Sequence, residues 1–333
     1  MEYRKLGNSD LALSVITFGA WAAGGWMWGG IEHSDAVNAI RAAYDNGITS
    51  IDTAPVYGQG DSEEVVGEAI RNLPRDKVQL LTKYGLRWDL KKGQFYFNTT
   101  NNKGESIDLY KYAGKESIIE ECNDSLRRLG TDYIDLYQIH WPDITTPVAE
   151  TMEAVAALIK QGKVRYAAVC NYNAAQLTEA QKCIQLVSDQ VPYSMLRKDI
   201  EEETLPYCKE HGLSILAYSP LQRGILSGKI KPGHQFAEGD NRSSLNFYKE
   251  ENIKRTNAFL EKIKPIADGN KIMLSQLVLR WTIDQPGITI ALAGARNAAQ
   301  AIENAKAADV ILTSEEINAI NNELSTLSLI KEK

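Results

Sequence analysis

The stretch DNGITSIDTAPVYG, residues 45–58, indicates how this chain folds. Gly47 follows a helix-like segment, and glycine readily takes the left-handed conformation that ends a helix. The next residues, ITSI, are typical of a short strand that is buried on both faces. Asp52 stands at the end of that strand, and Tyr57 follows in the loop. The stretch therefore predicts a parallel strand that brings polar groups to its carboxyl end.

The same order of helix, glycine and β-rich run recurs at Gly162, Gly212 and Gly287. Further runs of strand composition cover residues 15–19, 78–83, 133–140 and 186–190. Helices are expected between the strands, at residues 33–46, 62–72, 115–129, 147–160, 174–184, 201–211 and 273–284. Eight alternating β/α units predict a (β/α)8 TIM barrel. A doubly wound sheet is disfavoured because no Gly-x-Gly-x-x-Gly motif follows the first strand.

The whole chain, residues 1–333, is expected to form one domain, because it contains no hinge linker and no low-complexity tract. The opening residues EYRKLGNSDLALS predict a hairpin that turns at 7–9 and plugs the bottom of the barrel. The second helix is expected to be capped near Asp61–Ser62. Two connections, 84–114 and 228–251, are too long for simple turns, and structureless loops of that size are usually functional or disordered. Both are expected on the carboxyl face of the barrel, where such barrels hold their active sites.

Composition disfavours several classes of partner. The 37 Lys and Arg residues against 43 Asp and Glu give a net charge of −6, without an obvious basic face, so nucleic acid is not expected. The sequence has no long apolar run and no apolar N-terminal segment, so no membrane association is expected. The four cysteines have no Cys-x-x-Cys spacing, which suits a reducing compartment. We expect a cytoplasmic monomer, although an oligomer is compatible with the sequence.

Titratable residues at three consecutive strand ends are expected to meet on one rim: Asp52, Tyr57, Lys83 and His140. This set suits proton transfer to a carbonyl oxygen. Tyr57 is a protonated donor near neutral pH, and Lys83 is expected to lower its pKa. Asp52 would keep Lys83 charged, and His140 would orient the carbonyl or relay the proton. Taken singly, each has a structural explanation: a loop cap, a packed tyrosine, a solvated lysine or a core histidine.

Other chemistries fit the sequence less well. The other histidines, His33, His211 and His234, have no metal-ligand spacing, so no metal is expected. A Schiff-base lyase or isomerase would need Lys83 as a neutral amine, whereas a neighbouring Asp52 keeps it protonated.

Polar residues after the later strands form a second group. Loops after the seventh and eighth strands, with a helix N-terminus, usually form the phosphate site of such barrels. Gly294 allows close backbone approach, Arg296 can grip a phosphate, and Tyr218 offers a flat face for stacking. Asn171 and Gln190 could bind a carboxamide or a ribose. The alternative is ordinary turn chemistry, which also uses Gly-rich and Ser-Pro corners.

These motifs resemble those of the aldo-keto reductase family, in its bacterial branch. The likeness covers nearly the whole chain and rests on IDTAPVYGQGDSEEVVGEAI, LLTKYG, SLRRLGTDYIDLYQIHWPD, AYSPLQRGILSGK and GARNAAQAIENAKA. It implies NADPH-dependent reduction of a small aldehyde or ketone to an alcohol, with Tyr57 as general acid. It also implies that Arg242 reaches the cofactor. The implied cofactor site comprises Asn171, Gln190, Tyr218, Ser219, Leu221, Arg223, Gly224, Lys229, Gly294, Arg296, Gln300 and Asn304.

The chain departs from the family pattern at Cys170, where many relatives have a serine, and at Gln300, where others have an arginine. Arg296 would then be the main contact of the NADPH 2′-phosphate. Some members resemble cytoplasmic β-subunits of potassium channels, so a nucleotide-binding redox sensor with slow turnover is the alternative function. Tryptophans after strand ends predict an aromatic mouth for apolar carbonyls or sugar faces, or else simple loop packing: Trp21, Trp26, Trp28, Trp88 and Trp141.

Overall fold

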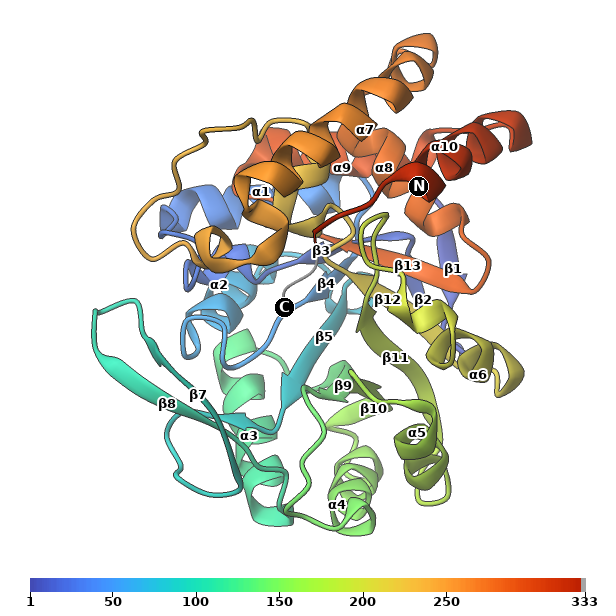
Figure 1. The fold of residues 1–333 in the computed structure, drawn as a ribbon. Helices are drawn as coiled ribbons and strands as arrows, with labels where there is room; N and C mark the ends of the chain where they lie inside the picture. The colour runs from blue at the N-terminus through green and yellow to red at the C-terminus, as the bar shows by residue number, and fades with distance from the viewer. Residues whose placement is uncertain (331–333) are drawn as a thin grey trace.

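The computed structural model describes residues 1–330. Its centre is a closed barrel of eight parallel strands, in which the last strand pairs with the first (Figure 1). The strands follow one another around the barrel in chain order: β3 (Ile16–Gly19), β4 (Ser50–Asp52), β5 (Gln79–Tyr84), β9 (Ile134–Ile139), β10 (Val164–Cys170), β11 (Leu186–Pro192), β12 (Ser214–Tyr218) and β13 (Ile288–Ala293). The (β/α)8 fold expected from the sequence is confirmed.

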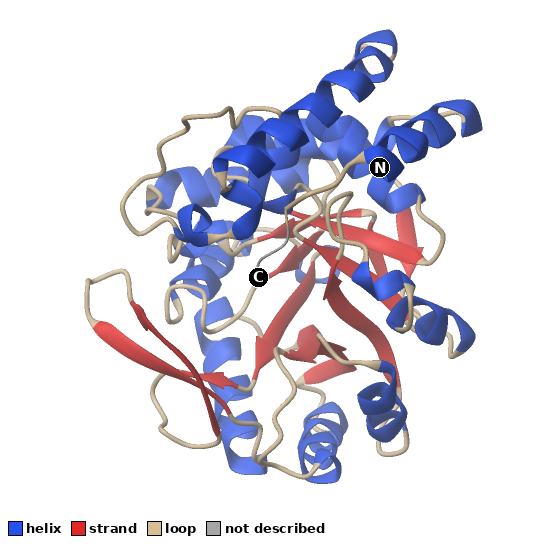
Figure 2. Cartoon of the chain, viewed as in Figure 1, coloured by secondary structure: helices blue, strands red, loops and turns tan. Residues whose placement is uncertain are grey.

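Helices surround the strands (Figure 2). Those that alternate with the barrel strands are α1 (His33–Asp45), α2 (Asp61–Ile70), α3 (Lys115–Leu129), α4 (Val148–Lys160), α5 (Ala174–Gln181), α6 (Thr204–Glu210), α8 (Leu274–Asp284) and α9 (Ala298–Lys306). None of the helices within residues 1–330 combines the length and the apolar character needed to cross a membrane.

Two additional helices, α7 (Glu250–Gly269) and α10 (Ser314–Thr326), contact each other. Helix α7 has no counterpart among the helices expected between the strands. Pro265 lies inside it, and a proline normally argues against a helix interior. The buried side chains of Leu260 and Ile263, however, give α7 an apolar face that packs on the core. Tertiary burial here outweighs the local signal.

The N-terminal hairpin covers the amino ends of the barrel strands, as the sequence predicted. Strands β1 (Tyr3–Lys5) and β2 (Ala12–Ser14) pair antiparallel. The backbone N–H of Gly7, in the turn, donates to Oγ of Ser214 at 2.9 Å, and Ser214 is the first residue of β12. Buried leucines of the hairpin pack against leucines inside the barrel. The hairpin therefore closes the end opposite to the carboxyl face.

Helix α2 is not capped by Asp61 or Ser62, so that expectation was wrong. The residue before the helix, Gly60, has a positive φ of 111° and no side chain to offer. The Ser62 hydroxyl instead donates to the carbonyl oxygen of Ala20 at 2.8 Å and pairs with the Thr53 hydroxyl at 2.9 Å. It thereby ties the helix to the loops after β3 and β4.

The long connection after β5 is not a structureless loop, because it contains regular secondary structure. It forms a three-stranded antiparallel sheet in the order β6 (Leu86–Arg87), β8 (Ser106–Lys111), β7 (Gln94–Thr100), which reaches out from the barrel (Figure 1). Nδ2 of Asn102, in the turn between β7 and β8, donates to Oδ2 of Asp61 at 2.9 Å and so joins the sheet to α2. The β7 sequence QFYFNTT is rich in the aromatic and β-branched residues that favour strands.

The second long connection is also ordered, through the short 3-10 helices η5 (Asn241–Ser244) and η6 (Asn246–Tyr248). The Asp240 carboxylate accepts the backbone N–H of Arg242 at 3.0 Å and begins the first of these. Asp240 also forms an isolated β-bridge with Trp28. The connection therefore lies against the loop that follows β3.

Candidate active site

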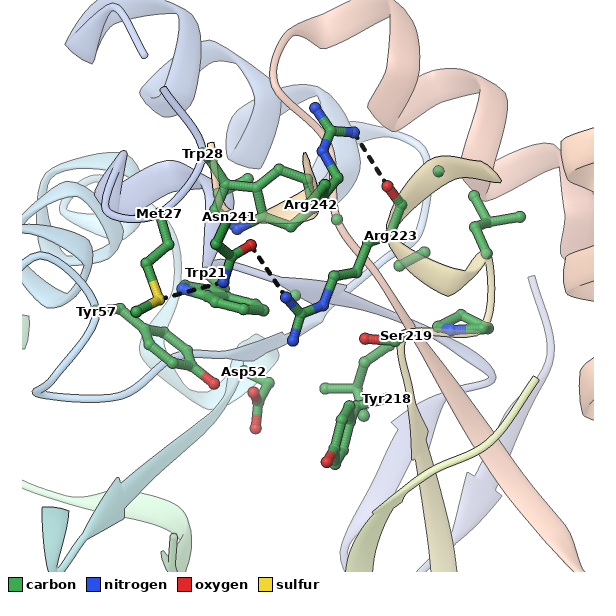
Figure 3. A pocket seen from close by; sticks show the side chains of 18 of the residues that line it. Trp21, Met27, Trp28, Asp52, Tyr57, Tyr218, Ser219, Arg223, Asn241 and Arg242 are labelled. Atoms are coloured by element: carbon green, nitrogen blue, oxygen red, sulfur yellow. Dashed lines mark hydrogen bonds between the residues drawn. The ribbon is translucent and has the colours of Figure 1, made fainter. Parts of the chain in front are cut away.

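A cleft of about 730 Å³ opens at the carboxyl ends of the barrel strands. Figure 3 shows side chains from the start of the chain, such as Asp52 and Tyr57, facing Tyr218 and Arg223 from its second half. All of the predicted site residues except Lys83 line this cleft. The exception is buried, with 1% of its surface exposed. The fold therefore brings together residues that the sequence separates by more than two hundred positions.

Asp52 and Lys83 form a buried ion pair at the floor of the cleft. Asp52 is the last residue of β4, and Lys83 lies one residue before the end of the neighbouring parallel strand β5. Nζ of Lys83 donates to Oδ1 of Asp52 at 2.5 Å and to the Thr53 carbonyl oxygen at 2.8 Å. Burial is the largest single influence and lowers the pKa of Lys83, but the charge and hydrogen bond of Asp52, together with Tyr57 and Cys170, more than offset it, so the pKa is raised. Lys83 is therefore an ammonium group at neutral pH, which does not suit a Schiff-base nucleophile.

Tyr57 stands on the loop after β4, with its ring centroid 5.0 Å from Nζ of Lys83. Its ring stacks beside Trp21 at a centroid distance of 5.9 Å. Loss of hydration raises the pKa of Tyr57 to about 12, although the Lys83 charge acts in the opposite direction. The expected lowering was therefore wrong in net direction, because desolvation outweighs the lysine. The phenol is protonated at neutral pH and can donate.

His140 follows the last residue of β9. Its ring lies 5.6 Å from the Tyr57 ring, at an interplanar angle of 81°. Burial and the nearby Lys83 charge hold the pKa of His140 well below its usual value. The imidazole is therefore neutral at pH 7, which suits a hydrogen-bonding group better than a second cation.

Gln138 is a buried residue of the site that the sequence did not suggest. Its Nε2 donates to Oδ2 of Asp52 at 3.1 Å, and the same oxygen accepts from Nε2 of Gln190 at 2.8 Å. Alternation of side chains along the strand is the sequence signal that could have identified Gln138. Gln138 and His140 are two residues apart, so their side chains face the same side of the sheet.

Asn171 and Gln190 present complementary amide groups to the cleft. Nδ2 of Asn171 donates to the His140 carbonyl oxygen at 3.1 Å, and its Oδ1 accepts from the Tyr218 hydroxyl at 3.0 Å. Both N–H groups of Gln190 are engaged, by Asp52 and Gln138. Within the described residues, one N–H of Asn171 and the oxygen of Gln190 are left for a ligand. A primary carboxamide needs such an acceptor and donor, so the pair fits a nicotinamide.

Arg223 supplies positive charge to the middle of the cleft. It donates to Oδ1 of Asn241 at 3.1 Å and its guanidinium lies 4.7 Å from the Trp21 ring. Arg242 pairs with Asp240 at 2.6 Å, whereas Arg223 has no carboxylate partner in residues 1–330. Burial lowers the pKa of Arg223, as expected for a cation without a counter-ion. The residue fits an anion such as the pyrophosphate of a dinucleotide.

The far end of the cleft lies at the start of α9. The backbone N–H of Arg296 donates to Oε1 of Gln300 at 2.9 Å. The side-chain Nη2 of Arg296 donates to the Gly30 carbonyl oxygen at 2.5 Å. Nδ2 of Asn304 donates to the carbonyl oxygen of Gly294 at 3.0 Å. The remaining predicted cofactor residues also line the cleft: Ser219, Leu221, Gly224 and Lys229.

The loop after β3 meets the 240–242 turn across the cleft (Figure 3). The backbone N–H of Asn241 donates to the Met27 carbonyl oxygen at 3.2 Å. Arg242 lies 5.0 Å from the Trp28 ring and donates to the carbonyl oxygen of Arg223 at 3.1 Å. Met27 and Asn241 were not predicted as site residues, because the contact joins segments that carry no shared motif.

Aromatic and apolar side chains line the cleft beyond Tyr57. The β6–β8–β7 sheet contributes Leu86, Tyr96 and Phe97, and Trp141 follows β9. Of the five predicted tryptophans, all but Trp88 line the cleft. In residues 1–330 no group of three or more His, Cys, Asp or Glu side chains could hold a metal ion.

Comparison with known proteins extends over nearly the whole chain. Residues 15–324 match the model of the aldo/keto reductase family. The chain is 38% identical to aldo-keto reductase YhdN of Bacillus subtilis, over 96% of this chain and 93% of that protein. It is 35% identical to the NADH-specific methylglyoxal reductase of Escherichia coli, over 94% and 95%. It is 33% identical to a probable voltage-gated potassium channel subunit beta of Arabidopsis thaliana, over 93% and 92%.

Solved structures share the fold. The glycerol dehydrogenase AKR11B4 from Gluconobacter oxydans superposes with a TM-score of 0.87 at 34% identity, covering 99% of this chain and 98% of that one. An aldo/keto reductase from Klebsiella pneumoniae in complex with NADP and acetate has a TM-score of 0.71 at 30% identity, covering 96% and 94%. The family match, the barrel and the cleft at its carboxyl face agree: the chain belongs to the aldo/keto reductase family and is an NAD(P)H-dependent carbonyl oxidoreductase.

Proposed function

We propose that this protein uses NADPH to reduce an aldehyde or ketone to the alcohol, with Tyr57 as the general acid. The observation that carries the proposal is the position of Tyr57 beside the buried Asp52–Lys83 ion pair and the neutral His140. A protonated phenol backed by an ammonium group is suited to donate to a carbonyl oxygen that gains negative charge.

Each residue of this group has a distinct part. The nicotinamide nucleotide supplies the hydride when bound. Tyr57 gives its proton to the substrate oxygen, and Lys83, 5.0 Å from the ring, stabilises the phenolate that remains. Asp52 keeps Lys83 charged and in place. His140, uncharged, directs a hydrogen bond to the substrate oxygen and so orients the carbonyl.

NADPH is proposed over NADH because of Arg296, which lies at the α9 end of the cleft, where the adenosine part of the nucleotide is proposed to bind. Arg296 carries a positive charge and has no carboxylate partner among residues 1–330. A guanidinium binds a phosphate with strong, charge-assisted hydrogen bonds. Relatives of both kinds exist: one solved relative is in complex with NADP, and another is named as NADH-specific. The nucleotide preference of this chain therefore rests on its own residues.

The proposed substrate is an uncharged carbonyl compound with an apolar body. The cleft wall beyond Tyr57 includes Leu86, Tyr96, Phe97 and Trp141. Such a wall removes apolar surface from water, and these four side chains carry no charge themselves.

Steady-state NADPH oxidation with a panel of aldehydes and ketones tests the proposal. We expect turnover with apolar carbonyls, and we expect Tyr57→Phe to lower kcat by about 10²–10⁴-fold, the usual contribution of a general acid. The NADPH affinity of the variant, followed by fluorescence titration, should stay near wild type. Near-normal turnover in Tyr57→Phe would exclude Tyr57 as the proton donor.

The likeness to a potassium channel subunit favours a second candidate, a nucleotide-binding regulatory subunit with slow turnover. The same assay separates the two functions. Tight NADPH binding without turnover on any carbonyl, together with a tetramer in size-exclusion chromatography, would support the regulatory subunit. Brisk turnover would support the reductase.

A further inference from the structure

Gln138 joins the catalytic and nucleotide sides of the site without lining the cleft. Its side chain is fully buried in β9, and its Nε2 donates to Oδ2 of Asp52 at 3.1 Å. Its Oε1 accepts from Nε2 of Gln190 at 3.2 Å, and the thiol of Cys170 lies 3.9 Å from the same oxygen. Asp52, Cys170 and Gln190 all line the cleft, whereas Gln138 does not. Gln138 can therefore act on a ligand only through these three neighbours.

The direction of each hydrogen bond in this network follows from the charge of Asp52. An ionised carboxylate only accepts hydrogen bonds. Because Oδ2 of Asp52 lies 2.8 Å from the Gln190 amide and 3.1 Å from the Gln138 amide, both glutamines must present N–H groups to it. The oxygen of Gln138 is then free to accept the second N–H of Gln190. Only the oxygen of Gln190 is left to face the cleft.

We propose that Gln138 is a positioning residue that locks the Gln190 amide with its oxygen toward the cleft. The same contacts tie that orientation to the ionised state of Asp52. The inference rests on the proposed function, since it takes the carboxamide of a nicotinamide as the group that Gln190 receives. Replacing Gln138 with an apolar side chain removes one hydrogen-bond partner from Gln190 and one from Asp52, and leaves both partly unsatisfied in a buried place.

The first experiment compares two nucleotides on the full-length protein by isothermal titration calorimetry. NADP⁺ carries the nicotinamide, whereas 2′-phospho-ADP-ribose lacks it and keeps the rest. Gln138→Leu should weaken NADP⁺ by about tenfold, as for one lost buried hydrogen bond, and leave 2′-phospho-ADP-ribose unchanged. Unchanged NADP⁺ affinity, or equal weakening of both nucleotides, would overturn the proposal.

Tyr137→Phe is the matched control. Tyr137 is the neighbouring residue of β9, faces the other side of the barrel wall, and donates to the Ile118 carbonyl oxygen at 3.3 Å. The variant also loses a buried hydrogen bond from the same strand, but it leaves the amide network intact. We expect both nucleotides to bind it as they bind the wild type.

The second experiment uses pH as a rescue. The groups that face Gln138 are Asp52 from β4, Cys170 from β10 and Gln190 from β11, and Lys83 from β5 holds the other oxygen of Asp52. In Gln138→Glu, a protonated carboxyl can donate to Asp52 and accept from Gln190, as the amide does. Once ionised, the new carboxylate has no proton to donate to Asp52, and the two negative charges repel each other.

Gln138→Glu should therefore bind NADP⁺ nearly as well as the wild type in acid and lose affinity as pH rises, relative to the wild type at each pH. Binding of 2′-phospho-ADP-ribose should change equally with pH in the two proteins. A constant ratio of NADP⁺ affinities would contradict the proposal. A wild type that binds NADP⁺ but reduces no carbonyl would overturn the proposed function and leave this comparison valid.

Discussion

Tyr57 shows how a single side chain is set by its surroundings. The loss of hydration in the cleft raises its pKa to about 12, and Lys83 offsets only part of that rise. A proton donor must be protonated before the reaction, and the raised pKa ensures this at neutral and moderately alkaline pH. In the proposed reaction, Lys83 acts after the proton transfer, when its ammonium group would face a phenolate instead of a phenol.

Arg296 provides the prediction at the residue scale. Its guanidinium is the proposed contact of the 2′-phosphate, and hydrogen bonds to a charged group contribute more than neutral ones. Arg296→Ala should weaken NADPH by about 10- to 100-fold and change NADH little. Fluorescence titration with the two nucleotides measures this, with NADH as the internal control. Equal weakening of both would mean that the 2′-phosphate is held elsewhere.

At the scale of elements, the ends of the barrel have separate tasks. The sheet β6–β8–β7 supplies apolar walls to the cleft on the carboxyl face. The hairpin β1–β2 plugs the opposite end, where its Gly7 N–H donates to Ser214, a residue that does not line the cleft. Changes in the hairpin should therefore alter stability, whereas changes in the sheet should alter which carbonyl compounds are accepted.

Gly7 gives the prediction for the hairpin. Its φ is +48°, and a Cβ there would lie 2.8 Å from the carbonyl oxygens of Gly212 and Val187. Gly7→Ala should lower the free energy of unfolding by about 1–3 kcal/mol more than a control, as overpacking does. The control is Gly104→Ala, with a φ of +81° and no atom within 4 Å, which adds strain without a clash. Chemical denaturation measures both, and equal losses would contradict the argument.

At the scale of the whole molecule, the cleft exists only when the barrel is closed. Strand β3, from the start of the chain, pairs with β13 from its end, and the lining residues come from both halves. An unfolded chain cannot bring these groups together. A nucleotide that bridges them therefore binds only the folded state, and its binding free energy adds to the stability of the barrel.

Thermal unfolding measures this linkage. NADPH at a concentration 100-fold above its Kd should stabilise the protein by about 2.7 kcal/mol and raise Tm by several degrees. NADH at the same concentration should raise Tm less, because it lacks the 2′-phosphate that Arg296 is proposed to bind. No rise in Tm at a concentration that saturates the binding titration would contradict this argument, because it would mean that the unfolded chain binds the nucleotide as well as the folded one does.

Much of the site could be predicted because its parts are local. Asp52, Lys83 and His140 each lie at or just after the end of a strand, so they could be assigned to one rim once the barrel was inferred. Gln138 could not be assigned in this way, since its proposed role depends on neighbours from three other strands. Helix α7 was missed because Pro265 masks an apolar face that only packing reveals.

The sequence by itself determined the order of strands and helices and the chemical types at the strand ends. These depend on side-chain periodicity and on glycine and proline, which act over a few residues. Only the tertiary structure decided the net direction of the Tyr57 pKa, the polarity of the amide network around Asp52 and the contact between Met27 and Asn241. Desolvation and hydrogen-bond pairing depend on what lies nearby in space, and a linear pattern does not contain that information.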